Sequence, residues 1–248
     1  MAPARPCRRP LPAPVAVSDL VLLSAGAAKG LVEGIAPPFH RETGAKIRGT
    51  FGAVGAMREK LVAGEPCDAC VSTAAILDAL AGEGRVVAAT IRPIGRVRTG
   101  VAVRKGDPVP PLGDAEALSA ALRNAPAIFL PDPEKATAGV HFVRVLDRMG
   151  LLATLAARLR PHPNGAIAMG ELARCGLPGA IGCTQVTEIL YTPGVVLAAM
   201  LPREFELATT YSAAVCTKAA APDLAARFVE WMCGERSAPL RTAGGFEG

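Results

Sequence analysis

The sequence predicts an α/β fold of two lobes, each built from a mainly parallel sheet flanked by helices. Strand-like apolar runs are followed at once by helix-like segments, a spacing typical of βαβ units. Two such sets are separated by a long strand-like segment, 95–104, and a loop rich in proline and glycine, 105–112. Aromatic residues make up only 4% of the 248 residues, so aliphatic side chains must fill the core, as in buried parallel strands.

The first set alternates regularly between strand and helix. We expect strands at 20–24, 47–51 and 70–72, followed by helices at 26–43, 56–63 and 74–81. The first strand is a short apolar run, and small residues follow each of the three strands. This order favours a parallel arrangement of the three strands.

The second set is less regular but carries clear helix boundaries. We expect strands at 128–130, 180–183, 195–199 and 207–216, and helices at 114–122, 137–149, 164–174, 222–233 and 238–243. Asp114 is well placed to cap the first of these helices, and Gly150 follows the second. The segments near 95–104 and 205–216 are the expected crossovers between lobes. Lobe 1 would then comprise 18–98 and 206–248, and lobe 2 residues 99–205.

Net charge and hydropathy limit the classes of partner that the sequence predicts. The formal charge is +5, but three of the arginines lie in 1–17, a leader with five prolines and no acid, which leaves +2 for the rest. No stretch combines clustered basic residues with aromatic ones, so nucleic-acid binding is not favoured. No apolar run reaches the length of a membrane span, and the leader lacks the apolar run of a signal peptide.

The seven cysteines do not form a metal or redox motif. They are odd in number and mostly lie within apolar runs, which predicts buried free thiols. The single CxxC, Cys67–Cys70, leads into a strand, whereas a redox pair is expected at a helix N-terminus. The three histidines are scattered. We therefore expect no metal and no cofactor.

Four strand-to-helix junctions consist of small residues, at 24–27, 53–56, 72–74 and 136–139. Small residues let a ligand approach the backbone, and the free N–H groups of a first helical turn favour an anion. In a two-lobed α/β protein the carboxyl ends of the strands meet at the cleft between lobes. The junctions therefore predict an anion site in that cleft.

Six motifs in order resemble a known family. They are SAGAAKGL, TFGAVGAMREKLVAGEPCDACVST, IGRVRTGVAV, PDPEKATAGVHFVRVL, PNGAIAM and IGCTQVTEI. The chain resembles, from about residue 20 to 246, the periplasmic molybdate-binding proteins, the substrate-binding components of ABC importers. The resemblance implies the type II periplasmic-binding fold, a monomer and an ABC permease as partner. It also implies a periplasmic location, with a start upstream of Met1; without export the protein would be cytoplasmic.

The oxyanion site of that family is only partly kept. Where the family has two ligand-binding serines, this chain has Gly26 and Val54, and where the family often has tyrosine it has Cys183. The resemblance carries over backbone N–H donors at Ala138 and near Asn164 and Gly165. Hydroxyl groups matched to a small oxyanion are therefore missing, which disfavours molybdate and favours an organic carboxylate.

The expected ligand-binding residues lie on these junctions and on the strands between them. They are Ser24, Ala25, Gly26, Ala27, Val54, Gly55, Thr73, Arg96, Arg98, Thr137, Ala138, His141, Asn164, Gly165, Cys183, Thr184 and Gln185. A guanidinium group suits a carboxylate. The alternative is that at most one of Arg96 and Arg98 faces the cleft and the other is solvated.

A branch of the same family is similar to aconitate isomerase, which moves a proton and a double bond on a tricarboxylate. Such an enzyme needs a base beside the acidic carbon. The candidates are His141 and Glu188, with Cys183 less favoured. The alternatives are a structural role for His141 against the other lobe and a surface or capping role for Glu188. The sequence therefore favours capture of an anion for an importer, with isomerisation of a tricarboxylate as the alternative.

Overall fold

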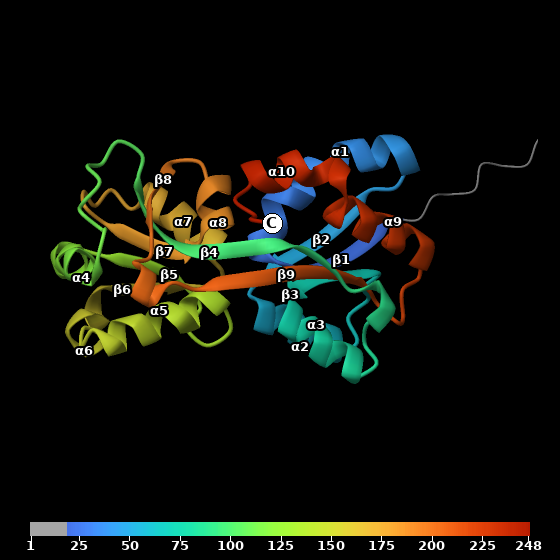
Figure 1. Cartoon of the computed structure of the whole chain (residues 1–248), viewed down its shortest axis with the longest axis horizontal. Coiled ribbons are helices and arrows are strands. Elements are labelled where there is room, and N and C mark those ends of the chain that lie inside the picture. The colour runs from blue at the N-terminus through green and yellow to red at the C-terminus, as the bar shows by residue number, and fades with distance from the viewer. Residues whose placement is uncertain (1–18) are drawn as a thin grey trace, which may run out of the picture.

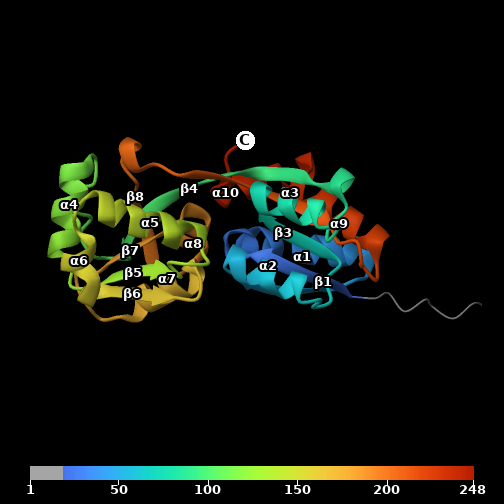
Figure 2. The ribbon, with the colours of Figure 1, turned by 90° about the horizontal axis from the view of Figure 1, so that it is seen from below.

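Two lobes lie side by side in the computed structural model, which describes residues 19–248; the predicted leader, 1–17, lies outside the described residues. Strands β4 (Arg92–Arg104) and β9 (Ala208–Val215) run next to each other from one lobe into the other (Figures 1 and 2). Strand β4 pairs with β9 over Arg92–Arg98 and with β7 and β8 over Thr99–Arg104. The exact lobe boundaries stay a prediction.

Lobe 1 is a sheet with helices on both faces. Its strand order is β2-β1-β3-β9-β4, with β1 (Leu20–Ala25), β2 (Ile47–Gly52) and β3 (Ala69–Thr73) parallel and β9 antiparallel to β3. On one face lie α1 (Lys29–Thr43), α9 (Pro222–Cys233) and α10 (Ala238–Ala243), and on the other α2 (Val54–Val62) and α3 (Ala74–Gly82) (Figure 1). A short 3-10 turn, η1 (Gly26–Ala28), connects β1 to α1.

Lobe 2 repeats this plan. Strands β5 (Ile128–Pro131), β6 (Leu159–His162) and β7 (Ile181–Gln185) are parallel, whereas β4 and β8 (Val195–Met200) are antiparallel additions. The helices are α4 (Ala115–Asn124), α5 (Thr137–Arg148), α6 (Leu152–Leu155), α7 (Gly165–Arg174) and α8 (Val186–Tyr191). The predicted fold class, two lobes each with a mainly parallel sheet, is confirmed.

The structure adds three short elements to those predicted. Strand β6 contains Pro161, which cannot donate a backbone hydrogen bond, and β6 ends the strand order, where proline is tolerated. Helix α6 has four residues and α8 six, too few for a helical period to be read from the sequence. Of these three elements, α8 is the most important for the site between the lobes, because it carries Glu188.

Each sheet is covered by two apolar layers. In lobe 1 one layer joins the sheet to α1 and α9 around Phe39 and Phe228, and the other joins it to α2 and α3 around Leu77. In lobe 2 the layers centre on Phe142 of α5 and Met169 of α7. The rings of Phe39 and Phe228 meet edge to face, with centroids 5.9 Å apart.

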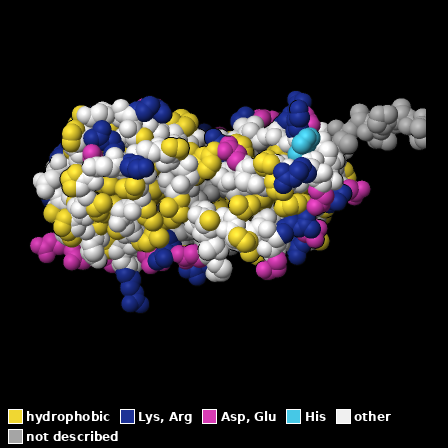
Figure 3. Space-filling view, turned by 90° about the horizontal axis from the view of Figure 1, so that it is seen from above, with side chains coloured by type: hydrophobic (Ala, Val, Ile, Leu, Met, Phe, Trp, Pro, Cys, Tyr) yellow, Lys and Arg dark blue, Asp and Glu magenta, His cyan; other side chains and the backbone are white. Residues whose placement is uncertain are grey.

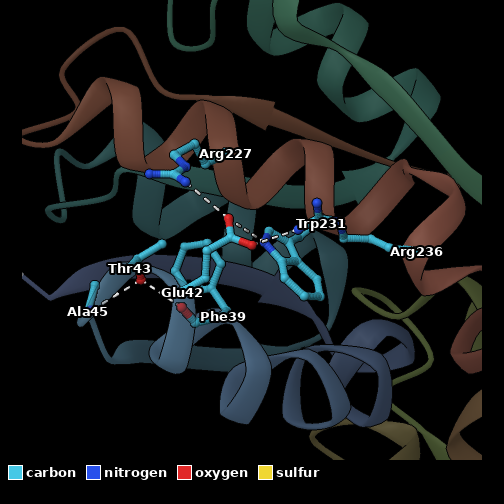
Figure 4. A network of polar contacts seen from close by, with 7 residues as sticks. All are labelled: Phe39, Glu42, Thr43, Ala45, Arg227, Trp231 and Arg236. Carbon is cyan, nitrogen blue, oxygen red and sulfur yellow. Dashed lines mark hydrogen bonds and ion pairs between the residues drawn. The ribbon is translucent and has the colours of Figure 1, made fainter.

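A polar network closes the outer end of the α1–α9 layer (Figure 4). The Glu42 carboxylate accepts hydrogen bonds from Arg227 at 3.1 Å, Arg236 at 2.8 Å and the Trp231 indole at 3.4 Å. The Arg236 guanidinium also lies 4.4 Å from the centre of the Trp231 ring. Arg236 is the main cause that lowers the pKa of Glu42. The network fixes α9, and the apolar layer beneath it, to the end of α1.

Charged side chains are distributed over the surface. On the face shown in Figure 3, basic and acidic groups are interspersed among apolar and neutral ones. No helix within residues 19–248 is long and apolar enough to cross a lipid bilayer.

Removing the Phe228 ring should destabilise lobe 1 strongly. The ring is fully buried, so Phe228→Ala leaves a cavity and is expected to lower the free energy of unfolding by about 3–5 kcal/mol. Urea denaturation followed by circular dichroism measures this change. Leu240→Ala, at a side chain that is exposed, is the control and should cost less than about 1 kcal/mol. Equal effects of the two substitutions would contradict this account of the core.

Candidate functional site

A small cavity lies between the two lobes. Its volume is about 20 Å³, room for about one water molecule. The lining residues are Ala25, Gly26, Ala27, Gly52, Ala53, Val54, Pro131, Ala136, Thr137, Ala138, Asn164, Gly165, Gln185, Glu188 and Tyr211. Within residues 19–248, none of those lining this cavity is Lys, Arg or His. Most of its wall is therefore backbone and small side chains.

Helical N-termini from both lobes face this cavity. Lobe 1 contributes Gly26 at the start of η1 and Val54 at the start of α2, and lobe 2 contributes Thr137 of α5 and Gly165 of α7. The first N–H groups of a helix lack partners within it and carry partial positive charge. These termini therefore give the cavity a positive potential although it contains no cationic side chain.

Glu188 is the one acidic residue in the lining. It lies on α8, its side chain is buried, and its Oε2 accepts a hydrogen bond of 2.6 Å from the Thr184 hydroxyl. A Cβ atom on Gly165 would lie 1.9 Å from Glu188 Oε2, and one on Gly26 would lie 2.7 Å from Oε1. The carboxyl group thus fills the space between a helical terminus of each lobe, which only glycine at both positions allows.

Burial raises the pKa of the Glu188 carboxyl group above its ordinary value of 4.5. The Thr184 hydroxyl and the nearby backbone N–H groups of Gly165, Ala166 and Gln185 act in the opposite direction. Desolvation disfavours the charged form, whereas hydrogen-bond donors favour it. A carboxyl group whose neutral form is favoured by burial and whose charged form is favoured by hydrogen bonds can both take up and release a proton.

Two further polar side chains reach the cavity wall beside Glu188. Burial, and then the Glu188 carboxyl group, raise the pKa of the Tyr211 hydroxyl, while the Thr137 and Gln185 side chains lower it. The Gln185 side chain is buried beside the Tyr211 hydroxyl, although its amide makes no hydrogen bond of normal geometry with another described residue. Gln185 and Tyr211 therefore form a polar part of the lining next to Glu188.

Ten of the residues expected at the site line this cavity. They are Ala25, Gly26, Ala27, Val54, Thr137, Ala138, Asn164, Gly165, Gln185 and the candidate base Glu188. The Asn164 side chain accepts a hydrogen bond from the Ile167 N–H at 2.9 Å and so caps α7. Thr184 lies directly behind the lining, through its bond to Glu188.

The two arginines lie elsewhere. Arg98 forms an ion pair of 2.7 Å with Glu247, close to the end of the chain. The backbone of Arg96 pairs with the backbone of Glu247, through N–O distances of 2.7 and 2.8 Å. Neither residue lines the cavity, so the structure does not provide the expected guanidinium group there. Both arginines instead hold the C-terminal segment against β4.

Five other predicted residues are also separate from the cavity lining. Ser24 is buried and donates to the Ala25 carbonyl at 3.0 Å, and the Thr73 hydroxyl caps α3 through the Ile76 N–H. Cys183 is enclosed in the core of lobe 2, where burial raises the pKa of its thiol. His141 bonds the Phe205 carbonyl at 2.7 Å and, with Gly55, lines a separate hollow.

Contacts across the cleft hold the lobes together. The Gly55 N–H donates to the Lys135 carbonyl at 3.1 Å, and the Lys135 ammonium group lies 2.8 Å from Glu59. On another side, the Tyr191 hydroxyl donates to Glu33 of α1. The cavity is therefore narrow in this position of the lobes, and a ligand larger than a water molecule requires them to separate.

The fold and site together define a class of protein. Two α/β lobes, two connecting strands and a cavity faced by helical N-termini are features of two-lobed solute-binding proteins. A family model described as bacterial extracellular solute-binding protein matches residues 20–247, and the chain belongs to this family.

The chain is also similar to three proteins with known names. The chain is 27% identical to aconitate isomerase from Pseudomonas sp., across 92% of this chain and 87% of the relative. Its fold resembles the periplasmic molybdate-binding protein of Azotobacter vinelandii, with a TM-score of 0.78 and 20% identity, covering 93% and 99% of the two chains. The sulfate-binding protein SubI from Mycobacterium tuberculosis has a TM-score of 0.71 and 16% identity, covering 92% and 86%.

A side chain at position 165 should displace the Glu188 carboxyl group. In Gly165→Ala the new Cβ would overlap Glu188 Oε2 and the Thr184 hydroxyl, so a loss of about 1–3 kcal/mol in unfolding free energy is expected. Gly170→Ala on the same helix is the control, because its nearest contact is the Arg174 side chain at 3.5 Å. Alanine there should be neutral or stabilising. Denaturant unfolding of both variants tests this; no loss in Gly165→Ala would contradict the packing described.

The stability of the protein should carry a pH dependence due to Glu188. Because its folded-state pKa is raised from 4.5, the protonated form favours folding. This contribution is present below the ordinary pKa and is lost as the pH rises through the raised value. Glu188→Gln cannot ionise, so its stability relative to the wild type should increase as the pH rises above the ordinary glutamate pKa of 4.5. Paired melting curves measure the difference; a pH-independent difference would refute the assignment.

Proposed function

We propose that the protein binds a small unsaturated polycarboxylate between its lobes and isomerises it by moving one proton, with Glu188 as the proton carrier. The observation that carries this proposal is the buried, ionisable Glu188 carboxyl group inside a cavity faced by helical N-termini. A site that only captures an anion gains nothing from a carboxylate at its wall. A site that moves protons requires such a group.

The proposed reaction is a proton shift along three carbon atoms. The Glu188 carboxylate takes a proton from the saturated carbon next to the double bond, so that a C–H bond breaks and an O–H bond forms. The electron pair spreads over the allylic system and its carboxylate. Glu188 then returns the proton to the far end of this system, which moves the double bond and restores the carboxylate. No oxidant, reductant or second substrate is required.

The remaining lining residues have roles in this reaction that follow from their chemistry. Backbone N–H groups at the helical termini would stabilise the charge that develops on the substrate carboxylate. The Gln185 amide and the Tyr211 hydroxyl would orient that carboxylate. Thr184 is a positioning residue, because it holds Glu188 through a 2.6 Å hydrogen bond. The similarity to aconitate isomerase supports an aconitate-like tricarboxylate as substrate.

The second candidate function is capture of a small anion for an ABC permease. Membership of the solute-binding family and the likeness to molybdate- and sulfate-binding proteins favour it. The same comparisons support a periplasmic location. The two functions differ in one respect that can be measured, namely whether the bound anion leaves unchanged.

Replacement of Glu188 should remove turnover. With cis-aconitate as substrate, Glu188→Gln is expected to lower the rate of trans-aconitate formation on the order of 10²–10⁴-fold, because the proton carrier is lost. Proton NMR follows the reaction, and in D₂O it also reports exchange at the reacting carbon. Glu116→Gln, at an exposed residue of α4, is the matched control and should keep full activity.

Two results would overturn the assignment. Full activity in Glu188→Gln would show that another group carries the proton. Tight binding of aconitate by the wild type, without turnover or exchange, would leave capture as the function.

A further inference from the structure

A larger hollow lies directly outside the cavity, at the junction of the two lobes. Its volume is about 460 Å³, and it shares Gly26 and Asn164 with the cavity. Lys29 and Phe51 line it from lobe 1, and Tyr191 and Arg174 line it from lobe 2. Hollows of this size hold small organic ligands. A polycarboxylate that the cavity cannot enclose would therefore extend into this hollow.

Lys29 is the cation best placed to meet such a ligand. Its ammonium group lies 5.5 Å from the centre of the Tyr191 ring and 6.0 Å from that of Phe51. Its nearest acidic partner, Glu33, lies 3.8 Å away and also accepts the hydrogen bond of Tyr191. The Arg174 guanidinium is tied to Glu171 at 2.7 Å, and its side chain is 68% exposed against 35% for Lys29. The Lys29 side chain is therefore less exposed to solvent than that of Arg174, and its ammonium group lies farther from its acidic partner.

The position of Lys29 is unfavourable for the helix that carries it. Lys29 is the first residue of α1, where the helix dipole disfavours a cation. Gly30 lets the Tyr191 ring pack directly on α1, because a Cβ atom there would lie 2.6 Å from the ring. The chain therefore keeps a cation at a positive helical end and packs an aromatic ring beside it. A cation at a helix N-terminus departs from the usual residue preference, and such departures are typical of binding sites.

We infer that Lys29 binds a second carboxylate of the ligand in this hollow, while a first carboxylate lies at the helical N-termini of the cavity. The inference deepens the proposed function and rests on the interlobe site being the one that binds the polycarboxylate. Lys29 would supply a cationic side chain to the interlobe site, whose inner cavity has none among its described lining residues. It also predicts that the site distinguishes polycarboxylates from monocarboxylates.

Calorimetric titration with cis-aconitate and with the monocarboxylate crotonate tests this inference. Lys29→Gln should weaken cis-aconitate binding by about 10- to 100-fold, as expected for loss of a charged hydrogen bond, and should leave crotonate binding unchanged. Lys29→Arg keeps the charge and should stay within about threefold of the wild type. Lys218→Gln, at an exposed lysine after β9, is the control. Since Lys29 opposes the helix dipole, Lys29→Gln should fold as stably as the wild type.

The outcomes separate this inference from the isomerase proposal. Selective loss of cis-aconitate binding in Lys29→Gln supports the subsite whether or not the wild type turns the ligand over. Equal effects of Lys29→Gln and Lys218→Gln would overturn the subsite, even in an active enzyme. Wild-type protein that binds no polycarboxylate at all would overturn it as well.

Discussion

Burial of the Glu188 carboxyl group is the constraint on which the interlobe site depends. A carboxyl group taken out of water needs compensation, and no cationic side chain among the cavity-lining residues provides it. The Thr184 hydroxyl and the N–H groups at the start of α7 provide it instead. This arrangement requires glycine at 26 and 165, since a Cβ atom at either position would overlap the carboxyl oxygens. The Glu188 side chain therefore requires glycine at one position in each lobe.

The same constraint couples the lobes. Glu188 belongs to α8, which follows a strand of lobe 2, yet α8 contacts η1 and α1 of lobe 1. Closure of the lobes buries the carboxyl group, and separation would expose it to water. Because β4 and β9 connect the lobes, bending of these two strands changes the environment of a group whose pKa depends on burial. Ligand entry and proton affinity are thus linked through one motion.

Much of the fold could be predicted from the sequence, and less of the site. Alternating apolar runs and small-residue junctions are local signals, and the predicted junctions at 24–27, 53–56 and 136–139 contain the helical starts at Gly26, Val54 and Thr137. The burial of Glu188 could not be read from the sequence, because α8 is too short to show a helical period. The pairing of Arg98 with Glu247 joins residues 149 positions apart, and no local pattern reports such a contact.

A two-lobed binding protein and an isomerase of the same fold can differ by little more than one residue that carries a proton. Helical N-termini that face an interlobe cavity favour an anion, and under the proposed function the same N–H groups would stabilise the negative charge that forms when a carbon beside a carboxylate loses its proton. What binding alone does not require is a base of suitable pKa inside the enclosure. Desolvation raises the proton affinity of an ordinary glutamate once the cavity closes around it. Under the proposed function the cleft would therefore activate this side chain as well as enclose the ligand, and function would reside in the site rather than in the fold.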